Sequence, residues 1–490
     1  MIPPLSTRSA LLTVAFLFAA SCEGVPPEPG ADGGAPPAGL DAGHGQGADG
    51  GLGLDGGLGV DGGLGVDGGL GVDGGLGVDG GLGVDGGPGV DGGLGVDGGL
   101  GVDGGSVDGG GIDGGAIDGG GAWPLPPLPF HTQGRWVMDA SGKRFKFASV
   151  NWYGGESPDF VVAGLDTQPL TKLAGLIRQE GFNSVRLPFS NELVEKNPRV
   201  AEARLSANPQ LVGLTALEVF DRVIEALAAQ GLVVILDDHV SRADWCCSDT
   251  DGNGLWYSAD YPESAWLADW RTMVARYRSQ KAVVAAELRN ELRAANGVTP
   301  VWGGNNSARD WRAAALRGGN AVLAENPALL VMVGGLTYST DFSGASSQPI
   351  SLDVANRLVW APHDYAWFHS AQDYSSVKTA TGNRWGFLLV QDKAYTAPVW
   401  VSEFGTCNTA EDCVTSTSGQ GLWFQSFLHV LDDADVDWSY WAFNGTESTG
   451  ASRTLGSPET YGILNTRWDA PALSSLLEAL KAHQGIVQTP

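Results

Sequence analysis

Basic residues are scarce in this chain of 490 residues, which has 29 lysines and arginines against 56 acidic side chains. The first 122 residues hold 17 of the acids and a single base, Arg8. Binding to a nucleic-acid duplex or to an anionic membrane requires a positively charged stripe, and neither part of the chain offers one. The sequence therefore predicts no nucleic-acid partner and leaves a neutral substrate open.

The N-terminus also lacks a hydrophobic run long enough to cross a bilayer. Its apolar stretch, ALLTVAFLFAA at residues 10–20, follows Arg8 and ends in small residues, whereas a spanning helix needs about 20 residues. This pattern is typical of an export signal, so we interpret residues 1–21 as a signal peptide. The sequence AASC resembles a bacterial lipoprotein cleavage site, which would make Cys22 a lipid anchor at the cell surface or outer membrane. Plain secretion is the alternative.

Residues 22–122 lack the large side chains of a packed core. Hexads such as GGLGVD repeat from Gly50 to Asp103. Glycine recurs at every third position, but only Pro88 interrupts the repeat, so a collagen triple helix would lack its stabilising residue. The hexad resembles the turn half of a calcium-binding β-roll without the strand half, and calcium binding stays an open alternative. We expect a disordered, acidic Gly/Asp-rich tether.

Residues 123–490 have a globular composition in which apolar, β-branched runs alternate with amphipathic helical patterns. The predicted strands are residues 145–154, 182–190, 232–240, 282–292, 329–336, 357–365, 397–405 and 436–445. The clearest helical patterns are residues 170–181, 215–231, 263–280, 308–327 and 421–433. Eight apolar strands alternating with helices predict an α/β domain of the (β/α)8 TIM barrel class.

The stretch AELRNELR, residues 286–293, distinguishes the two ways of interpreting charged residues here. On a helix surface its glutamates and arginines would be solvated pairs. Because an apolar strand opens immediately before it, we instead expect Glu291 at the carboxyl end of a barrel strand, where such barrels build their active sites.

Other strands end in residues suited to the same chemistry. They are Asn151, Trp152, Arg186, Asp238, His239, Asn290, His363, Tyr365, Glu403 and Trp441. Each could serve structure alone, but their occurrence together at equivalent strand ends predicts one site.

Two carboxylates across a barrel mouth suit cleavage of a glycosidic bond, with one protonated and one ionised. Arg186 and the Tyr365 hydroxyl can keep Glu403 ionised, while Asn290, His363 and partial burial can keep Glu291 protonated. Asn290 can bind a sugar 2-hydroxyl, and Trp441 can stack under the sugar ring. This reaction requires no cofactor and no metal.

The motifs GFNSVRLPFS, VILDDH, RNEL, APHDY, VSEFGT and WSYWAFNG resemble those of glycoside hydrolase family 5, the clan A cellulase-type barrels, over residues 145–465. The resemblance implies a retaining mechanism with Glu291 as acid/base and Glu403 as nucleophile. It implies substrate-binding roles for Arg186, His239, Asn290, His363, Tyr365 and Trp441. Leu292 replaces the proline of the usual Asn-Glu-Pro, and the loops look closer to a less characterised branch shared with plants and fungi.

Aromatic residues after strands 1, 3, 4 and 6 predict sugar-stacking subsites for an oligosaccharide or polymer. They are Trp152, Tyr153, Trp245, Trp256, Tyr257, Trp302 and Trp367. About half should instead pack loops onto the barrel, Trp256 among them. Trp152 and Trp245 are the two we expect to bind substrate.

Four cysteines remain after Cys22. We expect a local Cys407–Cys413 disulfide, and either a vicinal pair or free thiols at Cys246 and Cys247. Zinc binding by the four is the alternative, although no CxxC spacing supports it.

The sequence thus predicts an exported, monomeric, endo-acting β-glycosidase, first an endo-β-1,4-glucanase acting on a β-linked oligosaccharide or polysaccharide. Mannan, another β-glucan or a glycolipid as substrate, or transglycosylation in place of hydrolysis, would use the same site. A non-catalytic surface carbohydrate-binding protein is the alternative from another class.

Overall fold

The computed structural model describes residues 123–485. The predicted signal peptide, the Cys22 anchor and the tether lie outside the described residues, as do residues 486–490. No helix among the described residues is both long and apolar enough to cross a membrane.

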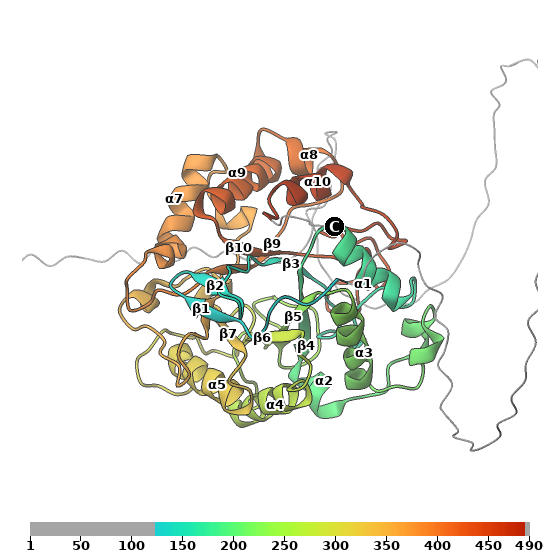
Figure 1. Ribbon diagram of the computed structural model, residues 1–490, viewed down its shortest axis with the longest axis horizontal. Coiled ribbons are helices and arrows are strands. Elements are labelled where there is room, and N and C mark those ends of the chain that lie inside the picture. Colours follow the sequence, from blue (N-terminus) through green and yellow to red (C-terminus); the bar gives the residue numbers. More distant parts are fainter. Residues whose placement is uncertain (1–122, 486–490) are drawn as a thin grey trace, which may run out of the picture. The chain divides into compact units, whose positions relative to one another are not determined.

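Eight parallel strands form one sheet in the order β8-β7-β6-β5-β4-β3-β10-β9 (Figure 1). They are β3 (Ala148–Asn151), β4 (Ser184–Ser190), β5 (Val233–Val240), β6 (Val283–Glu287), β7 (Leu330–Val333), β8 (Leu358–Trp360), β9 (Trp400–Phe404) and β10 (Asp437–Tyr440). Parallel bridges Trp360–Val399 and His363–Glu403 join the two edge strands. The predicted (β/α)8 barrel is therefore confirmed, and every predicted strand is present in shorter form.

Helices surround the strands (Figure 1). They are α1 (Leu170–Gln179), α2 (Asn191–Lys196), α3 (Ala216–Ala229), α4 (Glu263–Arg276), α5 (Trp311–Glu325), α7 (Tyr374–Arg384), α8 (Asp412–Thr415), α9 (Gly419–Ala434) and α10 (Ser474–Ala482), with a single turn at α6 (Leu336–Ser339). The five helical patterns of the sequence correspond to α1, α3, α4, α5 and α9. Helix α7 escaped prediction because only Val377 and Thr381 are buried along it, which leaves no apolar stripe.

Local sequence explains where these elements begin and end. Helix α3 starts at a capping box in which Thr215 and Glu218 each bind the other's backbone N–H. It ends before Gly231, whose φ of +68° favours glycine, and a Cβ there would come within 2.6 Å of the Trp123 carbonyl oxygen. The chain then enters β5, where every residue is buried.

A short antiparallel hairpin, β1 (His131–Gln133) and β2 (Trp136–Met138), precedes the barrel. Phe130 immediately precedes this hairpin, and Val137 lies in β2. Both pack in one apolar cluster with the inward side chains of the barrel strands, including Val233, Ile235 and Met332. Val233 and Ile235 lie in the amino-terminal half of β5, and Leu330 of the same cluster is the first residue of β7. The hairpin therefore closes the amino-terminal end of the barrel and leaves the carboxyl end for a site.

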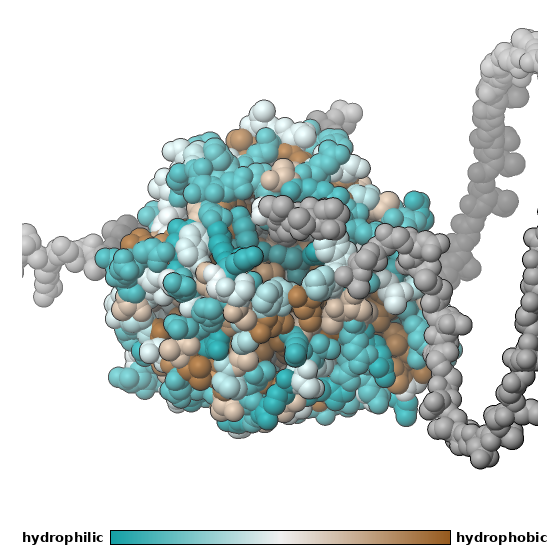
Figure 2. All heavy atoms as spheres, in the orientation of Figure 1, coloured by the Kyte–Doolittle hydropathy of each residue, from teal (hydrophilic) through white to brown (hydrophobic). Residues whose placement is uncertain are grey.

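The surface is mostly hydrophilic. Figure 2 shows only small hydrophobic patches among hydrophilic side chains on the face it presents. Among the described residues, the large hydrophobic side chains that are exposed are Val212, Trp367, Val390 and Leu455. Of these, Trp367 has a place in the site.

Candidate active site

An open cleft lies at the carboxyl ends of the strands. Its lining includes residues predicted from the sequence at the strand ends and in the following loops, namely His239, Trp245, Asn290, Glu291, Tyr365, Glu403 and Trp441. Trp367 lines it as well, and loops after β5 and β10 supply Cys246, Cys247, Arg453, Glu459, Thr460 and Tyr461. The strand-end residues thus converge on one cavity.

Arg186 of β4 organises the floor of this cleft. Its side chain is completely buried, and its guanidinium bonds to Glu287 (Nε–Oε2 2.5 Å), Asp237 (Nη2–Oδ2 3.1 Å) and Glu403. Burial lowers the pKa of Arg186, but these three carboxylates raise it above its ordinary value. One cation therefore faces several buried acids, so the site cannot keep all of them ionised without a large desolvation cost.

Glu291 and Glu403 meet above Arg186, with His363 between them. Nδ1 of His363 lies 2.9 Å from Glu291 Oε1 and 3.5 Å from Glu403 Oε2. One oxygen of each carboxylate and a nitrogen of His363 all lie within 4.8 Å of one another. The Tyr365 hydroxyl donates to Glu403 Oε2 at 3.2 Å. Glu403 thus has two further donors, Arg186 and Tyr365, that Glu291 does not share.

Burial raises the pKa of both carboxyl groups. The pKa of Glu291 rises to about 7 against the lowering effect of Arg293 and Arg186. The pKa of Glu403 also rises to about 7, although His363 and Arg186 lower it. Burial lowers the pKa of His363, which favours its neutral form. Because Glu403 alone bonds to Arg186, a proton shared by the two carboxyls is better placed on Glu291.

The backbone holds Glu291 in an unusual conformation. Its φ is +36°, in the left-handed region that few non-glycine residues adopt. Two contacts of the neighbouring residues fix this position. Arg293 Nη1 donates to the Glu291 carbonyl at 2.9 Å, and the Asn290 N–H donates to the Asp238 carbonyl at 3.0 Å.

Asn290 and His239 form an oriented pair beside the carboxylates. The Asn290 Oδ1 accepts from Arg186 Nη2 at 3.0 Å, which turns its Nδ2 toward His239 Nε2 at 3.2 Å. Asp237 Oδ2 lies 2.6 Å from His239 Nδ1. Burial lowers the pKa of His239 well below its ordinary value, so the neutral ring donates from Nδ1 and accepts at Nε2.

Trp441 forms an aromatic wall. Its ring stacks on Tyr153 at 5.2 Å between centroids and lies nearly parallel to the His239 ring at 5.7 Å. Trp245 is 6.0 Å from Trp441, and the Arg453 guanidinium lies 3.8 Å over the Trp245 ring. Trp367, which also lines the cleft, stacks on Tyr365 at 4.4 Å and remains 44% exposed.

Two expectations need correction. Trp152 is completely buried, packs against Phe443 and donates its indole N–H to the Ala163 carbonyl, so it belongs to the core and does not line the cleft. Asp238 bonds to Arg289 at 3.1 Å in a separate buried network, because alternate residues of a strand point to opposite faces. Trp256 is buried as expected.

Several residues of the site escaped prediction. Asp237 and Glu287 could have been found, since Asp237 lies two residues before His239 and so shares its face of the strand. Arg453, Glu459 and Tyr461 come from the long loop after β10, where no strand or helix pattern marks them. Arg453 pairs there with Glu459 and donates to the Tyr153 hydroxyl at 2.9 Å.

The cysteines pair locally. Cys407 is bonded to Cys413, as predicted, and Cys246 to Cys247, the vicinal alternative. These sulfurs are therefore not available as zinc ligands. Among the described residues, two groups bring three potential metal ligands within 4.8 Å: Cys246, Cys247 and Glu291, and Glu291, His363 and Glu403. The first includes the disulfide, and the second is the carboxylate pair with its imidazole.

Comparisons with known proteins agree with this geometry. The model of the cellulase family, glycosyl hydrolase family 5, matches residues 138–447. An endoglucanase of Paenibacillus polymyxa is 31% identical over 384 residues, which cover 73% of this chain and 89% of that protein. A glycosyl hydrolase 5 family protein of the plant Chamaecyparis obtusa is 31% identical over 388 residues, covering 74% and 67%.

A solved structure gives the same result. The catalytic domain of the major endoglucanase from Xanthomonas campestris pv. campestris superposes with a TM-score of 0.62 and 27% identity, and the match covers 73% of this chain and all of that domain. On the family model and on these relatives, the chain is a glycoside hydrolase and belongs to glycoside hydrolase family 5.

Proposed function

We propose that this enzyme is a retaining, endo-acting β-glucanase that hydrolyses β-1,4-linked glucan by double displacement. Glu403 is the nucleophile and Glu291 is the acid/base. The observation that carries the proposal is the approach of their carboxylate oxygens to within 4.8 Å. Retaining enzymes separate their two carboxyl groups by about 5–5.5 Å, whereas inverting enzymes leave a wider gap for a water molecule.

The surrounding contacts support this division of roles. Glu403 accepts hydrogen bonds from Arg186 and Tyr365, which stabilise the charged form that attacks the anomeric carbon. Glu291 contacts only the imidazole of His363 among these groups, and its burial favours the protonated form that donates to the leaving oxygen. After cleavage, the same Glu291, now ionised, takes a proton from the water that releases the sugar.

The glycan-binding residues surround the same point. Asn290, turned by Arg186, can offer its amide to a sugar 2-hydroxyl, and Trp441 offers a ring face at the point of cleavage. Trp367 extends the aromatic surface to the exposed rim. An open cleft lined by several aromatic residues suits a chain cut internally, and it supports an endo-acting enzyme.

Replacing Glu403 with Gln tests the proposal. We expect hydrolysis of cellotetraose to fall by about a thousandfold or more, because the amide cannot form the glycosyl-enzyme bond. The variant should unfold at the same temperature as the parent. In the parent, NMR should show the β-anomer as the first product. The α-anomer as first product, or unchanged turnover in the variant, would contradict the mechanism.

The substrate is tested separately with a panel of β-1,4-glucan, mixed-linkage β-glucan, mannan and a glycolipid. We expect the highest kcat/KM on β-1,4-glucan. A preference for mannan would keep the mechanism and change the substrate, and polysaccharide binding without release of reducing ends would favour the non-catalytic alternative. Transglycosylation would appear as products longer than the substrate.

We also propose that the protein is exported and acts as a monomer. The signal-like residues 1–21 and the two disulfides support an oxidising compartment outside the cytoplasm. Metabolic labelling with a fatty acid in the parent and in a Cys22→Ser variant would test the lipid anchor. Size-exclusion chromatography with light scattering would test the monomer.

A further inference from the structure

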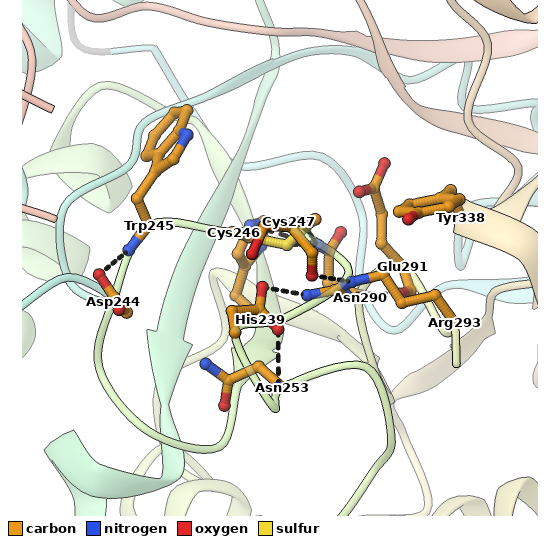
Figure 3. Close-up of a disulfide and its surroundings, with 12 residues drawn as sticks. His239, Asp244, Trp245, Cys246, Cys247, Asn253, Asn290, Glu291, Arg293 and Tyr338 are labelled. Atoms are coloured by element: carbon orange, nitrogen blue, oxygen red, sulfur yellow. Dashed lines mark hydrogen bonds and ion pairs between the residues drawn. A yellow bond between two sulfur atoms is a disulfide. The ribbon is translucent and has the colours of Figure 1, made fainter. Parts of the chain in front are cut away.

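The vicinal disulfide lies in the cleft, at a position that the mechanism has not used. Cys246 and Cys247 follow β5 and are 5% and 4% exposed. Their sulfur atoms and a carboxylate oxygen of Glu291 lie within 4.8 Å of one another. Figure 3 shows the pair with Trp245 on one side and with Glu291 and Tyr338 on the other.

The pair is fixed to both site residues of the RNEL motif. Asn290 Nδ2 lies 3.5 Å from Cys246 Sγ and 3.6 Å from Cys247 Sγ. Arg293 ties the following loop to the backbone of Glu291, because its Nη1 donates to the Glu291 carbonyl at 2.9 Å and its Nε to the Ser248 carbonyl at 3.2 Å. The same guanidinium pairs with Asp251. These contacts therefore fix the position of the disulfide relative to Glu291.

Tyr338 packs against the disulfide. It packs on the small apolar cluster of Val240, Cys246 and Cys247, and its hydroxyl bonds to Asp249. The residue lies in the α6 turn, where Tyr338 and both its neighbours have positive φ values between 51° and 58°. Three successive non-glycine residues in this region are strained, so the surrounding structure must hold the turn that carries Tyr338.

The position of the disulfide relative to the two carboxylates gives its role. The two sulfurs lie within 4.8 Å of an oxygen of Glu291, and Glu291 is also the carboxylate that lies within 4.8 Å of His363 and Glu403. Glu403 must face the anomeric carbon of the sugar that stays, while Glu291 must face the oxygen of the sugar that leaves. We propose that the Cys246–Cys247 disulfide is the apolar wall of the subsite that holds the leaving-group sugar. This inference rests on the roles proposed above for Glu291 and Glu403.

The chemistry of the group fits this use. A disulfide has no strong hydrogen-bond donor and presents a polarisable, apolar surface, which suits the C–H face of a sugar ring. Two free thiols or two serines would place donors beside the Glu291 carboxyl and would leave the loop free to move. The disulfide therefore favours the leaving sugar over water at the place where the acid/base acts.

The test measures the activity of the full-length protein on two substrates. Cellotetraose requires both proton donation and a bound leaving sugar. 2,4-Dinitrophenyl β-cellobioside requires neither, because dinitrophenolate leaves unaided. In the Cys246→Ser/Cys247→Ser variant we expect kcat/KM for cellotetraose to fall about tenfold, in the range that a lost apolar contact gives. We expect kcat/KM for the aryl cellobioside to change by less than about twofold.

The second disulfide supplies the matched control. Cys407 and Cys413 do not line the cleft, so Cys407→Ser/Cys413→Ser should leave the ratio of the two kcat/KM values unchanged. Alkylation of the unreduced parent should leave Cys246 and Cys247 unmodified by mass spectrometry. Equal losses on both substrates in the Cys246/Cys247 variant, no loss on either, or alkylated thiols in the parent would overturn the proposal.

A second variant covers the case in which the serine pair does not fold. Tyr338→Ala removes the ring that packs against the disulfide at a partly exposed position, and we expect the substrate ratio to shift about threefold in the same direction. An unchanged ratio would overturn the proposal. Failure of the proposed function would look different, because the parent would then cleave neither substrate.

Discussion

The two ends of the barrel interior differ completely in polarity, although the same strands build both. Along β5, Val233 and Ile235 point into the apolar cluster under the hairpin, and Asp237 and His239 continue the same inward face into the charged site. Apolar packing stabilises the fold, whereas buried charges cost desolvation. Four successive inward positions of β5 therefore run from the end of the barrel that stabilises the fold to the end that carries the reactive groups.

The charged end is balanced by Arg186, so Arg186→Met should have the largest effect. It leaves Asp237, Glu287 and Glu403 without their cation, and we expect kcat/KM on cellotetraose to fall about a thousandfold. The free energy of unfolding should fall by about 3–5 kcal/mol in urea denaturation. Adding Glu287→Gln should restore part of the stability and none of the activity. Restored activity in the double variant would show that Arg186 acts only on stability.

The apolar end should lose stability without losing chemistry. Leu330 of β7 is completely buried in the inner cluster, and Leu330→Ala should lower the free energy of unfolding by about 2–5 kcal/mol. At a temperature where the variant is folded, kcat on cellotetraose should match that of the parent. A fall in kcat larger than about threefold would show that the two ends are coupled.

The pH dependence of kcat/KM tests the charged end of the barrel alone. Catalysis needs one proton on the Glu291–Glu403 pair, and the pKa of each group is raised to about 7. We expect kcat/KM to follow a bell-shaped curve with limbs on both sides of about pH 7. A kcat/KM that rises steadily from pH 7 down to a maximum at pH 4 would contradict the raised pKa values.

Asp269 on α4 provides a control for that curve. Burial raises its pKa to about 7, so the folded state holds a proton that the unfolded state has already lost above pH 3.8. Stability from this group is therefore present at low pH and is lost as the pH rises from about 4 to 7. Asp269→Asn should remove this part of the pH dependence of unfolding and leave the bell-shaped curve unchanged.

The smallest effect is expected at the rim. Trp367 is 44% exposed and stacks on Tyr365, and Trp367→Ala removes a sugar-binding surface without touching the carboxylates. We expect KM for cellotetraose to rise about fivefold with kcat unchanged, since the lost contact is worth about 1 kcal/mol. A fall in kcat would place Trp367 closer to the reaction than its exposure indicates.

How far the sequence could predict this site depends on strand periodicity. Arg186, His239, Asn290, Glu291 and Glu403 were found because parallel strands end at the same edge of the barrel and the polar residues stand at those ends. Asp237 and Glu287 follow from the same logic, since the two-residue period gives each strand a second inward position.

The rest could not be predicted because loops have no period. Arg453 and Tyr461 reach the cleft from the loop after β10, and only the fold brings them there. Trp152 shows the opposite failure. It follows a strand end, but its indole N–H donates to the Ala163 carbonyl inside the core. No sequence pattern predicts that partner. The vicinal disulfide was foreseen as one of two alternatives, and its place beside Glu291 was not.

The first described residue, Trp123, lies at the end of the barrel opposite the reaction. The ring of Trp123 lies under the Arg178 guanidinium, and its carbonyl lies next to Gly231 just before β5 begins. Gly231 lies at the amino-terminal end of the barrel, so Trp123 sits at the end away from the two carboxylates. The mouth of the cleft is therefore clear of this first described residue, and a glycan strand that crosses the mouth does not meet Trp123.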